Sequence, residues 1–93
     1  MPYYKLVVRR HRMSDEIYQK KMFETDDKEA LNRVREILQE DGVIKHFPKK
    51  YDVVLYNYLT DENIYKQSFK YNIGMKSYIV FECRWDRVKS CCN

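Results

Sequence analysis

The chain has 93 residues, of which 44% are hydrophobic and 15% aromatic, and its formal net charge is +4 at pH 7. This composition predicts one globular domain over residues 1–93 and excludes an intrinsically disordered chain. We find no signal-peptide pattern and no apolar run near the ~18 residues of a membrane span, so neither export nor membrane insertion is expected. Cys83, Cys91 and Cys92 are odd in number and two are adjacent, which favours a reducing cytoplasm over a disulfide framework.

The first two segments predict a β-hairpin. Residues 2–12 alternate between apolar and mostly polar side chains, as in a half-buried strand. Ser14-Asp15-Glu16 predicts a turn, and residues 17–24 are predicted as the second strand. The first strand divides into an apolar face with Tyr4, Leu6 and Val8 and an opposite face with Lys5, Val7, Arg9 and His11.

One helix follows the hairpin. Asp26 is a favourable N-cap, and Glu29 three residues later forms a variant of the capping box. Gly42 predicts the end of the helix, because glycine readily adopts the left-handed backbone of that position. The apolar stripe at helical spacing consists of Ala30, Leu31, Val34, Ile37 and Leu38.

Three runs rich in β-branched and aromatic residues then predict an antiparallel meander over residues 51–59, 64–71 and 77–85. Pairing Leu59 with Tyr65, through a five-residue loop or an equivalent bulge, keeps the apolar residues of the first two runs on one face. In the last run, alternation places Ile79, Phe81, Cys83 and Trp85 toward the helix and Tyr78, Val80, Glu82 and Arg84 away from it.

The predicted fold is therefore α+β, with one helix packed on one face of an antiparallel sheet in the order ββαβββ. One helix cannot cover both faces, so the second face stays open to solvent or to a partner. We call it the open face. Residues 86–93 are polar and are expected to fray.

The open face carries the main functional prediction, because it mixes aromatic rings with cations. Bases of single-stranded nucleic acid stack on such rings while the cations contact phosphates. The alternative to a binding function is that the tyrosines tolerate a partly solvated sheet surface and the Lys and Arg side chains only keep it soluble. The predicted binding residues are Lys5, Arg9, His11, Tyr56, Tyr58, Lys66, Lys70, Tyr78 and Arg84.

A protein partner is the second hypothesis, because tyrosine and arginine also dominate protein-interface hot spots. A chain of this size without enzyme motifs fits an inhibitor of phage or mobile-element type that blocks a host protein complex. An uncovered sheet edge is also a candidate surface for a homodimer.

Catalysis, cofactors and metals are not predicted. Neither His11 nor His46 lies in a metal-binding motif, and the adjacent Cys91-Cys92 does not reproduce zinc-ligand spacing. Asp52 with Glu82-x-Arg84 only distantly matches a nuclease site.

The chain start, Met1-Pro2 and the strand after it, resembles the tautomerase superfamily, whose members use an N-terminal proline as a general base. That resemblance implies a helix at residues 17–24, where the pattern instead predicts a strand, and a second βαβ half that the sequence lacks. No catalytic role is therefore assigned from it.

Overall fold

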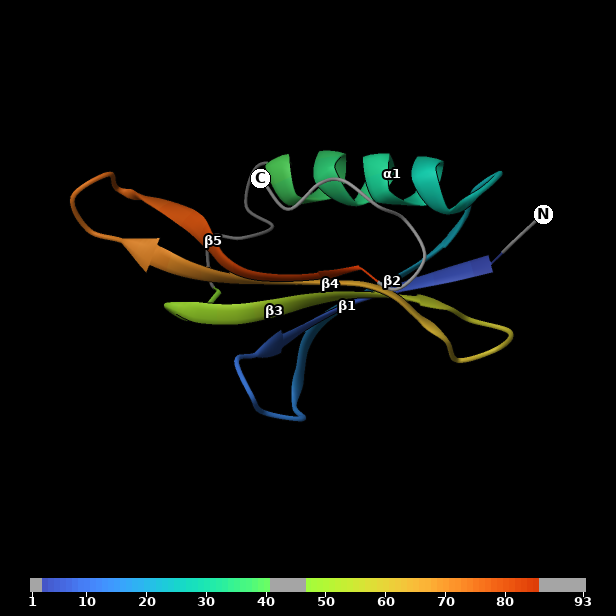
Figure 1. Cartoon of the computed structure of the whole chain (residues 1–93), viewed down its shortest axis with the longest axis horizontal. Helices are drawn as coiled ribbons and strands as arrows, with labels where there is room; N and C mark the ends of the chain where they lie inside the picture. The colour runs from blue at the N-terminus through green and yellow to red at the C-terminus, as the bar shows by residue number, and fades with distance from the viewer. Residues whose placement is uncertain (1–2, 41–46, 86–93) are drawn as a thin grey trace.

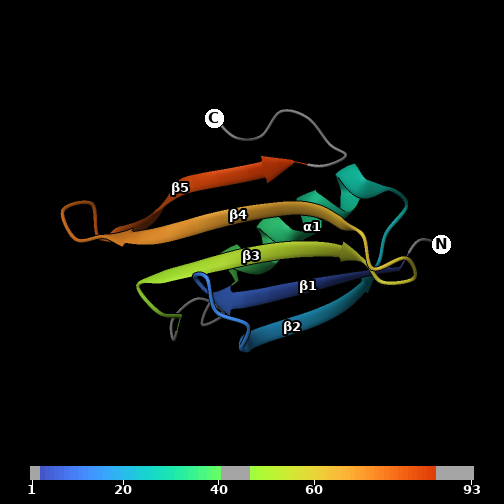
Figure 2. The same cartoon turned by 60° about the horizontal axis from the view of Figure 1, so that its bottom comes forward.

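The computed structural model describes residues 3–40 and 47–85, and the side chains of these residues as far as Glu82. All five strands form one antiparallel sheet in the order β2-β1-β3-β4-β5. Helix α1 lies on one face of this sheet (Figure 1), and no helix of the described residues lies on the other face (Figure 2). The predicted α+β order ββαβββ is confirmed. The elements are β1 Tyr3–Arg10, β2 Glu16–Phe23, α1 Asp27–Gln39, β3 Lys50–Asn57, β4 Asn63–Asn72 and β5 Ser77–Trp85.

The first hairpin forms as predicted. β2 occupies the segment in which the tautomerase resemblance implies a helix, so the resemblance does not extend to the fold. β1 pairs with β2 on one side and with β3 on the other, whereas β2 and β5 form the two edges of the sheet.

Helix α1 begins at the predicted cap. The Asp26 side chain accepts a hydrogen bond from the Glu29 backbone N–H at 2.9 Å, which satisfies a donor of the first turn. The helix ends at Gln39, with Glu40 as its C-cap, and the predicted terminator Gly42 lies outside the described residues. No helix in residues 3–40 or 47–85 is long and apolar enough to cross a bilayer.

The core lies between α1 and the sheet. Ala30, Leu31, Val34 and Ile37 of the predicted stripe are buried, and Leu38 is partly buried against the same cluster. The Tyr4 hydroxyl donates a 2.8 Å hydrogen bond to Asp27, so this buried ring also has a polar partner. The strand residues of the core are Tyr4, Leu6, Val8, Met22, Tyr51, Val53, Leu55, Ile64 and Tyr65.

The β3–β4 hairpin confirms the predicted apolar face for Val53, Leu55 and Phe69 but not the predicted pairing, and Leu59, predicted on the same face, is exposed in the turn. Leu55, rather than Leu59, lies opposite Tyr65, and the strands are joined by residues 58–62. Because Leu55 and Leu59 are four residues apart, both registers place the same side chains toward the helix. The pairing also shifts between Leu55 and Tyr56, which agrees with the expected bulge.

A second irregularity corrects the prediction for β5. The β4–β5 register shifts between Ser68 and Phe69, so that Phe69 lies opposite Val80 while Ser68 lies opposite Glu82. One extra residue in β5 inverts the alternation on one side of the bulge. Tyr78 therefore packs on the helix side, where its hydroxyl donates to the carbonyls of Phe47 and Pro48. Phe81, predicted to face the helix, instead lies on the open face, in ring contact with His11.

Replacing the buried Ile37 with Ala tests the packing of α1. We expect Ile37→Ala to lower the free energy of unfolding by about 2–5 kcal/mol, because it leaves a cavity between the helix and the sheet. Urea denaturation measures this change. The control Glu36→Ala alters an exposed neighbour and is expected to stay within about 0.5 kcal/mol. Similar values for the two variants would contradict the described core.

Candidate nucleic-acid interface

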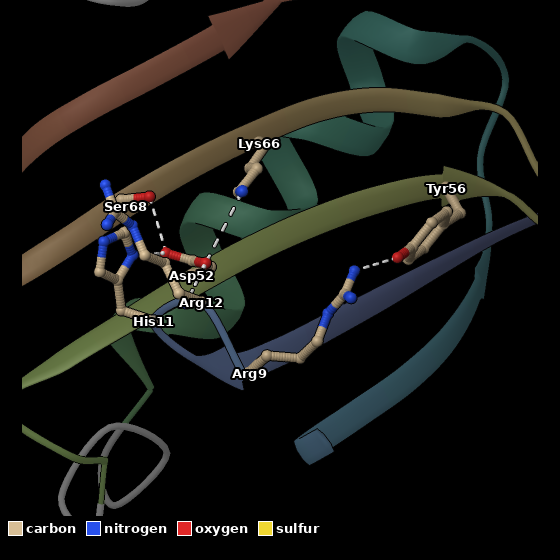
Figure 3. Close-up of polar contacts among 7 residues, drawn as sticks. All are labelled: Arg9, His11, Arg12, Asp52, Tyr56, Lys66 and Ser68. Atoms are coloured by element: carbon tan, nitrogen blue, oxygen red, sulfur yellow. Dashed lines mark hydrogen bonds and ion pairs between the residues drawn. The ribbon is translucent and has the colours of Figure 1, made fainter. Parts of the chain in front are cut away.

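The open face is held at its centre by a buried carboxylate, Asp52 of β3, which is 4% exposed. His11 Nδ1 lies 2.7 Å from Asp52 Oδ1, and the Ser68 hydroxyl donates to the same oxygen at 2.7 Å. On the other oxygen, the Arg12 backbone N–H donates at 3.4 Å and the Lys66 ammonium lies 3.7 Å away. Figure 3 shows these groups converging on Asp52 with α1 behind the strands. The carboxylate thus joins β3, β4 and the β1–β2 connection.

These partners keep Asp52 ionised. Burial alone would raise the pKa of a carboxyl group, but the hydrogen bonds from His11, Ser68 and the Arg12 backbone, together with the charge interaction with His11, outweigh it. The net result is an Asp52 pKa below its usual value. Because an ionised carboxylate only accepts hydrogen bonds, both His11 and Ser68 point their donors at it.

One end of the open face carries an aromatic ring surrounded by cations. The Phe81 ring lies edge-on to His11 at 5.0 Å, and the ammonium groups of Lys50 and Lys70 each lie 5.9 Å from its centroid. Lys50 and Lys70 are directly opposite on β3 and β4, and neither forms an ion pair with a described carboxylate. We call His11, Lys50, Lys70 and Phe81 the Phe81 cluster.

The other end repeats this combination. The Tyr3 and Phe23 rings stack at 4.4 Å with an interplanar angle of 4°, and Tyr58 lies 4.5 Å from Tyr3. Lys21 lies over the Tyr58 ring at 4.9 Å and directly opposite Lys5, which has a 4.0 Å ion pair with Glu16. The Phe23 cluster, as we name it, consists of Tyr3, Lys5, Lys21, Phe23 and Tyr58.

A shallow hollow lies beside the Phe23 cluster. Its volume is about 400 Å³, and Tyr56 and Tyr58 both contribute to its lining. Both an ammonium group and carboxylates line it, so hydrogen-bond donors and acceptors are present at its wall. The remaining lining residues are Lys5, Glu16 and Asp61.

Between the clusters, the cations are partly engaged with the protein itself. Val7 and Val54 lie opposite each other on this face, away from α1, and are 0% and 1% exposed. Their neighbours on the face include Arg9 and Lys66, whose long aliphatic stems can cover apolar surface. The Arg9 guanidinium also donates to the Tyr56 hydroxyl. Arg9 and Lys66 therefore have structural roles.

Most of the residues predicted for binding do share this face. Lys5, Arg9, His11, Tyr56, Lys66 and Lys70 lie on it, and Tyr58 lies at its rim in the β3–β4 turn. Tyr78 does not, because it packs against Tyr51 on the helix side. Arg84 lies opposite Lys66 in the β4–β5 register, and its side chain is outside the described part of the structure.

Sequence reasoning missed Tyr3, Lys21, Phe23, Lys50 and Phe81. Alternation along β1 and β3 would have identified Tyr3 and Lys50, because they continue the series of Lys5 and Tyr56. Phe81 depends on the bulge in β5, for which the sequence offers no turn or glycine signal.

The polar network does not have the geometry of a catalytic triad. In such a triad the serine donates to the histidine, which in turn donates to the aspartate. Here Ser68 and His11 both point at Asp52 Oδ1. Within residues 3–40 and 47–85 there is also no group of three or more His, Cys, Asp or Glu side chains placed to hold a metal ion.

Comparison with protein-family models, with curated proteins and with solved structures finds no match to this chain.

The Asp52 network predicts a pH-dependent contribution to stability. At pH 7, Asp52→Asn is expected to lower the free energy of unfolding by about 1–3 kcal/mol, since it removes charge-assisted hydrogen bonds in a buried site. The folded-state pKa lies below the unfolded value of about 3.9, so this contribution is present above that pH and is lost as the pH falls through the folded-state pKa.

Urea denaturation at pH 7, 5 and 3 measures the difference between the wild type and Asp52→Asn. We expect the difference to narrow at pH 3. The exposed Asp61→Asn serves as a control with the same change of charge. An equal difference for Asp52→Asn at all three pH values would contradict the assigned role of the carboxylate.

Proposed function

We propose that this protein binds single-stranded nucleic acid on its open face and does so without catalysis. The observation that carries the proposal is the pairing of exposed aromatic rings with lysines that stand directly opposite each other on neighbouring strands. Such a pair occurs at Lys5 and Lys21 in the Phe23 cluster and at Lys50 and Lys70 in the Phe81 cluster.

Lysine pairs of this kind are unfavourable for folding alone. Like charges directly opposite in a sheet repel each other and lower its stability. Phosphate groups would relieve the repulsion and release counterions on binding. Among the ion pairs within the described residues, only the one between Lys5 and Glu16 neutralises any of these four lysines.

The rings supply the second half of the argument. Phe23 is 59% exposed and Phe81 is 37% exposed, so ring surface is available for stacking at both ends of the face. Base stacking on an aromatic side chain contributes about 1–3 kcal/mol per base and requires an unpaired, splayed base. A single strand satisfies this requirement, whereas a duplex keeps its bases stacked inside.

A protein partner is the second candidate. It is favoured by large apolar side chains at the tips of two hairpins, where Leu59, Ile73 and Met75 are exposed beyond the sheet. An inhibitor that blocks a protein complex would use these tips together with the rings of the open face. Ionic strength separates the two functions, because counterion release makes only nucleic-acid binding fall steeply with salt.

Fluorescence anisotropy with labelled single- and double-stranded DNA and RNA tests the proposal. At 50 mM salt we expect micromolar or tighter binding of a twelve-nucleotide single strand, weaker binding of the duplex, and a steep loss of affinity at 200 mM salt. If neither form binds at 50 mM salt, nucleic-acid binding is rejected and the protein-partner candidate remains.

The lysine pair of the Phe81 cluster predicts a change in salt dependence. For the double variant Lys50→Gln/Lys70→Gln, we expect the slope of log affinity against log salt to fall in magnitude by about 1.4, because each lost phosphate contact on a single strand removes about 0.7. The control is Lys28→Gln. Lys28 is an exposed residue of α1, on the opposite side of the sheet from the open face, so its loss should leave the slope unchanged. An equal slope for wild type and the double variant would argue against phosphate contacts at this pair.

A further inference from the structure

From the two clusters we infer that the open face is bipartite. One strand of nucleic acid stacks a base on the Phe23 cluster and a second base on the Phe81 cluster, and its backbone crosses the sheet between them. This inference rests on the proposed function and adds to it the length and form of the ligand.

The two clusters are equivalent in chemistry but stand on different strands. The Phe23 cluster is built on β1, β2 and the β3–β4 turn, whereas the Phe81 cluster joins β3, β4 and β5 to the residue after β1. Each combines an exposed ring with two opposed lysines, which match a base and its flanking phosphates. Neither cluster shares a residue with the other, so each can hold its own nucleotide.

The length of β1 sets the part of the separation that runs along the strands, and the distance between the edge strands β2 and β5, which carry Phe23 and Phe81, adds to it. Tyr3 stands at the start of β1 in the Phe23 cluster, and His11 follows the end of β1 in the Phe81 cluster. These eight residues correspond to about 26 Å at the ~3.3 Å rise of a strand. A stacked nucleic-acid strand with a rise of about 3.4 Å per nucleotide therefore needs at least about eight nucleotides to join the two rings.

The middle of the face fits a connecting backbone rather than a third stacked base. Arg9 and Tyr56 already contact each other, and Asp52 is enclosed by its four partners. The Lys66 ammonium, on the other hand, lies at the surface side of this network, in position to contact a passing phosphate. Stacking at both ends with backbone contacts between them describes a ligand that is one continuous single strand.

Binding two linked sites predicts a length threshold. A trinucleotide is too short to join the clusters, whereas a dodecanucleotide reaches both. If only one subsite existed, a dodecamer would bind about tenfold more tightly than a trinucleotide, because it offers ten overlapping positions. With two linked sites its affinity is expected to be higher than that of the trinucleotide by about 100-fold or more. Affinities for single strands of 3, 6, 9 and 12 nucleotides, measured by anisotropy competition at 50 mM salt, are expected to rise beyond this tenfold factor and then level off.

Variants at each end test the same inference. Phe23→Leu and Phe81→Leu keep apolar bulk but remove the ring, and each is expected to weaken dodecamer binding about 5- to 100-fold. Tyr71→Leu is the matched control, because Tyr71 is 38% exposed but lies opposite Tyr78 on the other face, and it should bind like the wild type. Unchanged thermal unfolding confirms that each variant is folded.

The outcomes separate the inference from the proposed function. A length gain above tenfold, with a loss of at least fivefold for both ring variants, supports the bipartite face. A gain of tenfold or less, or a loss below fivefold for either ring variant, overturns it while single-strand binding stands. If no strand of any length binds, the inference and the proposed function both fail.

Discussion

Within the described residues one helix covers one face of the five-stranded sheet, so the second face must meet water with the side chains of the strands, and this constraint governs the rest of the structure. The protein meets it with long, amphipathic residues rather than with a second layer. Arg9 and Lys66 neighbour the otherwise uncovered Val7 and Val54, and the buried Asp52 ties three segments together by hydrogen bonds. The centre of the open face is therefore a small polar and apolar core in its own right, and exposed groups are displaced to its two ends.

This arrangement divides the cations into two kinds. Those at the centre have partners within the protein, so they contribute to stability. Lys21, Lys50 and Lys70 have no described carboxylate partner, and each stands opposite another lysine. A sequence whose local choices conflict with folding at particular sites often does so for function. The repulsion between opposed lysines therefore distinguishes the two ends of the open face from an ordinary solvent-exposed surface more clearly than the net charge of the chain does.

The sequence was sufficient for the fold because the signals for each element are local. The alternation in β1, the cap at Asp26 and the stripe of α1 each specify their element without distant contacts. The candidate site was predicted only in part, because alternation assigns a residue to a face of the sheet correctly only as long as no bulge interrupts the strand. One bulge in β5 was enough to exchange Tyr78 and Phe81 between faces. The Asp52 network joins residues 11, 52 and 68, and no local pattern connects such distant positions.

The bulge in β5 also has an evolutionary consequence. Phe81 is the extra residue of the bulge and lies on the open face, whereas Tyr78, three residues earlier, packs in the core. Deleting Phe81, or one of the two residues between it and Tyr78, would restore regular pairing and take this ring off the open face, although the hairpin and most of the amino-acid composition would be retained. The aromatic surface at this end is thus one codon away from gain or loss, and related chains with a similar fold are expected to differ here through insertions and deletions more than through substitutions.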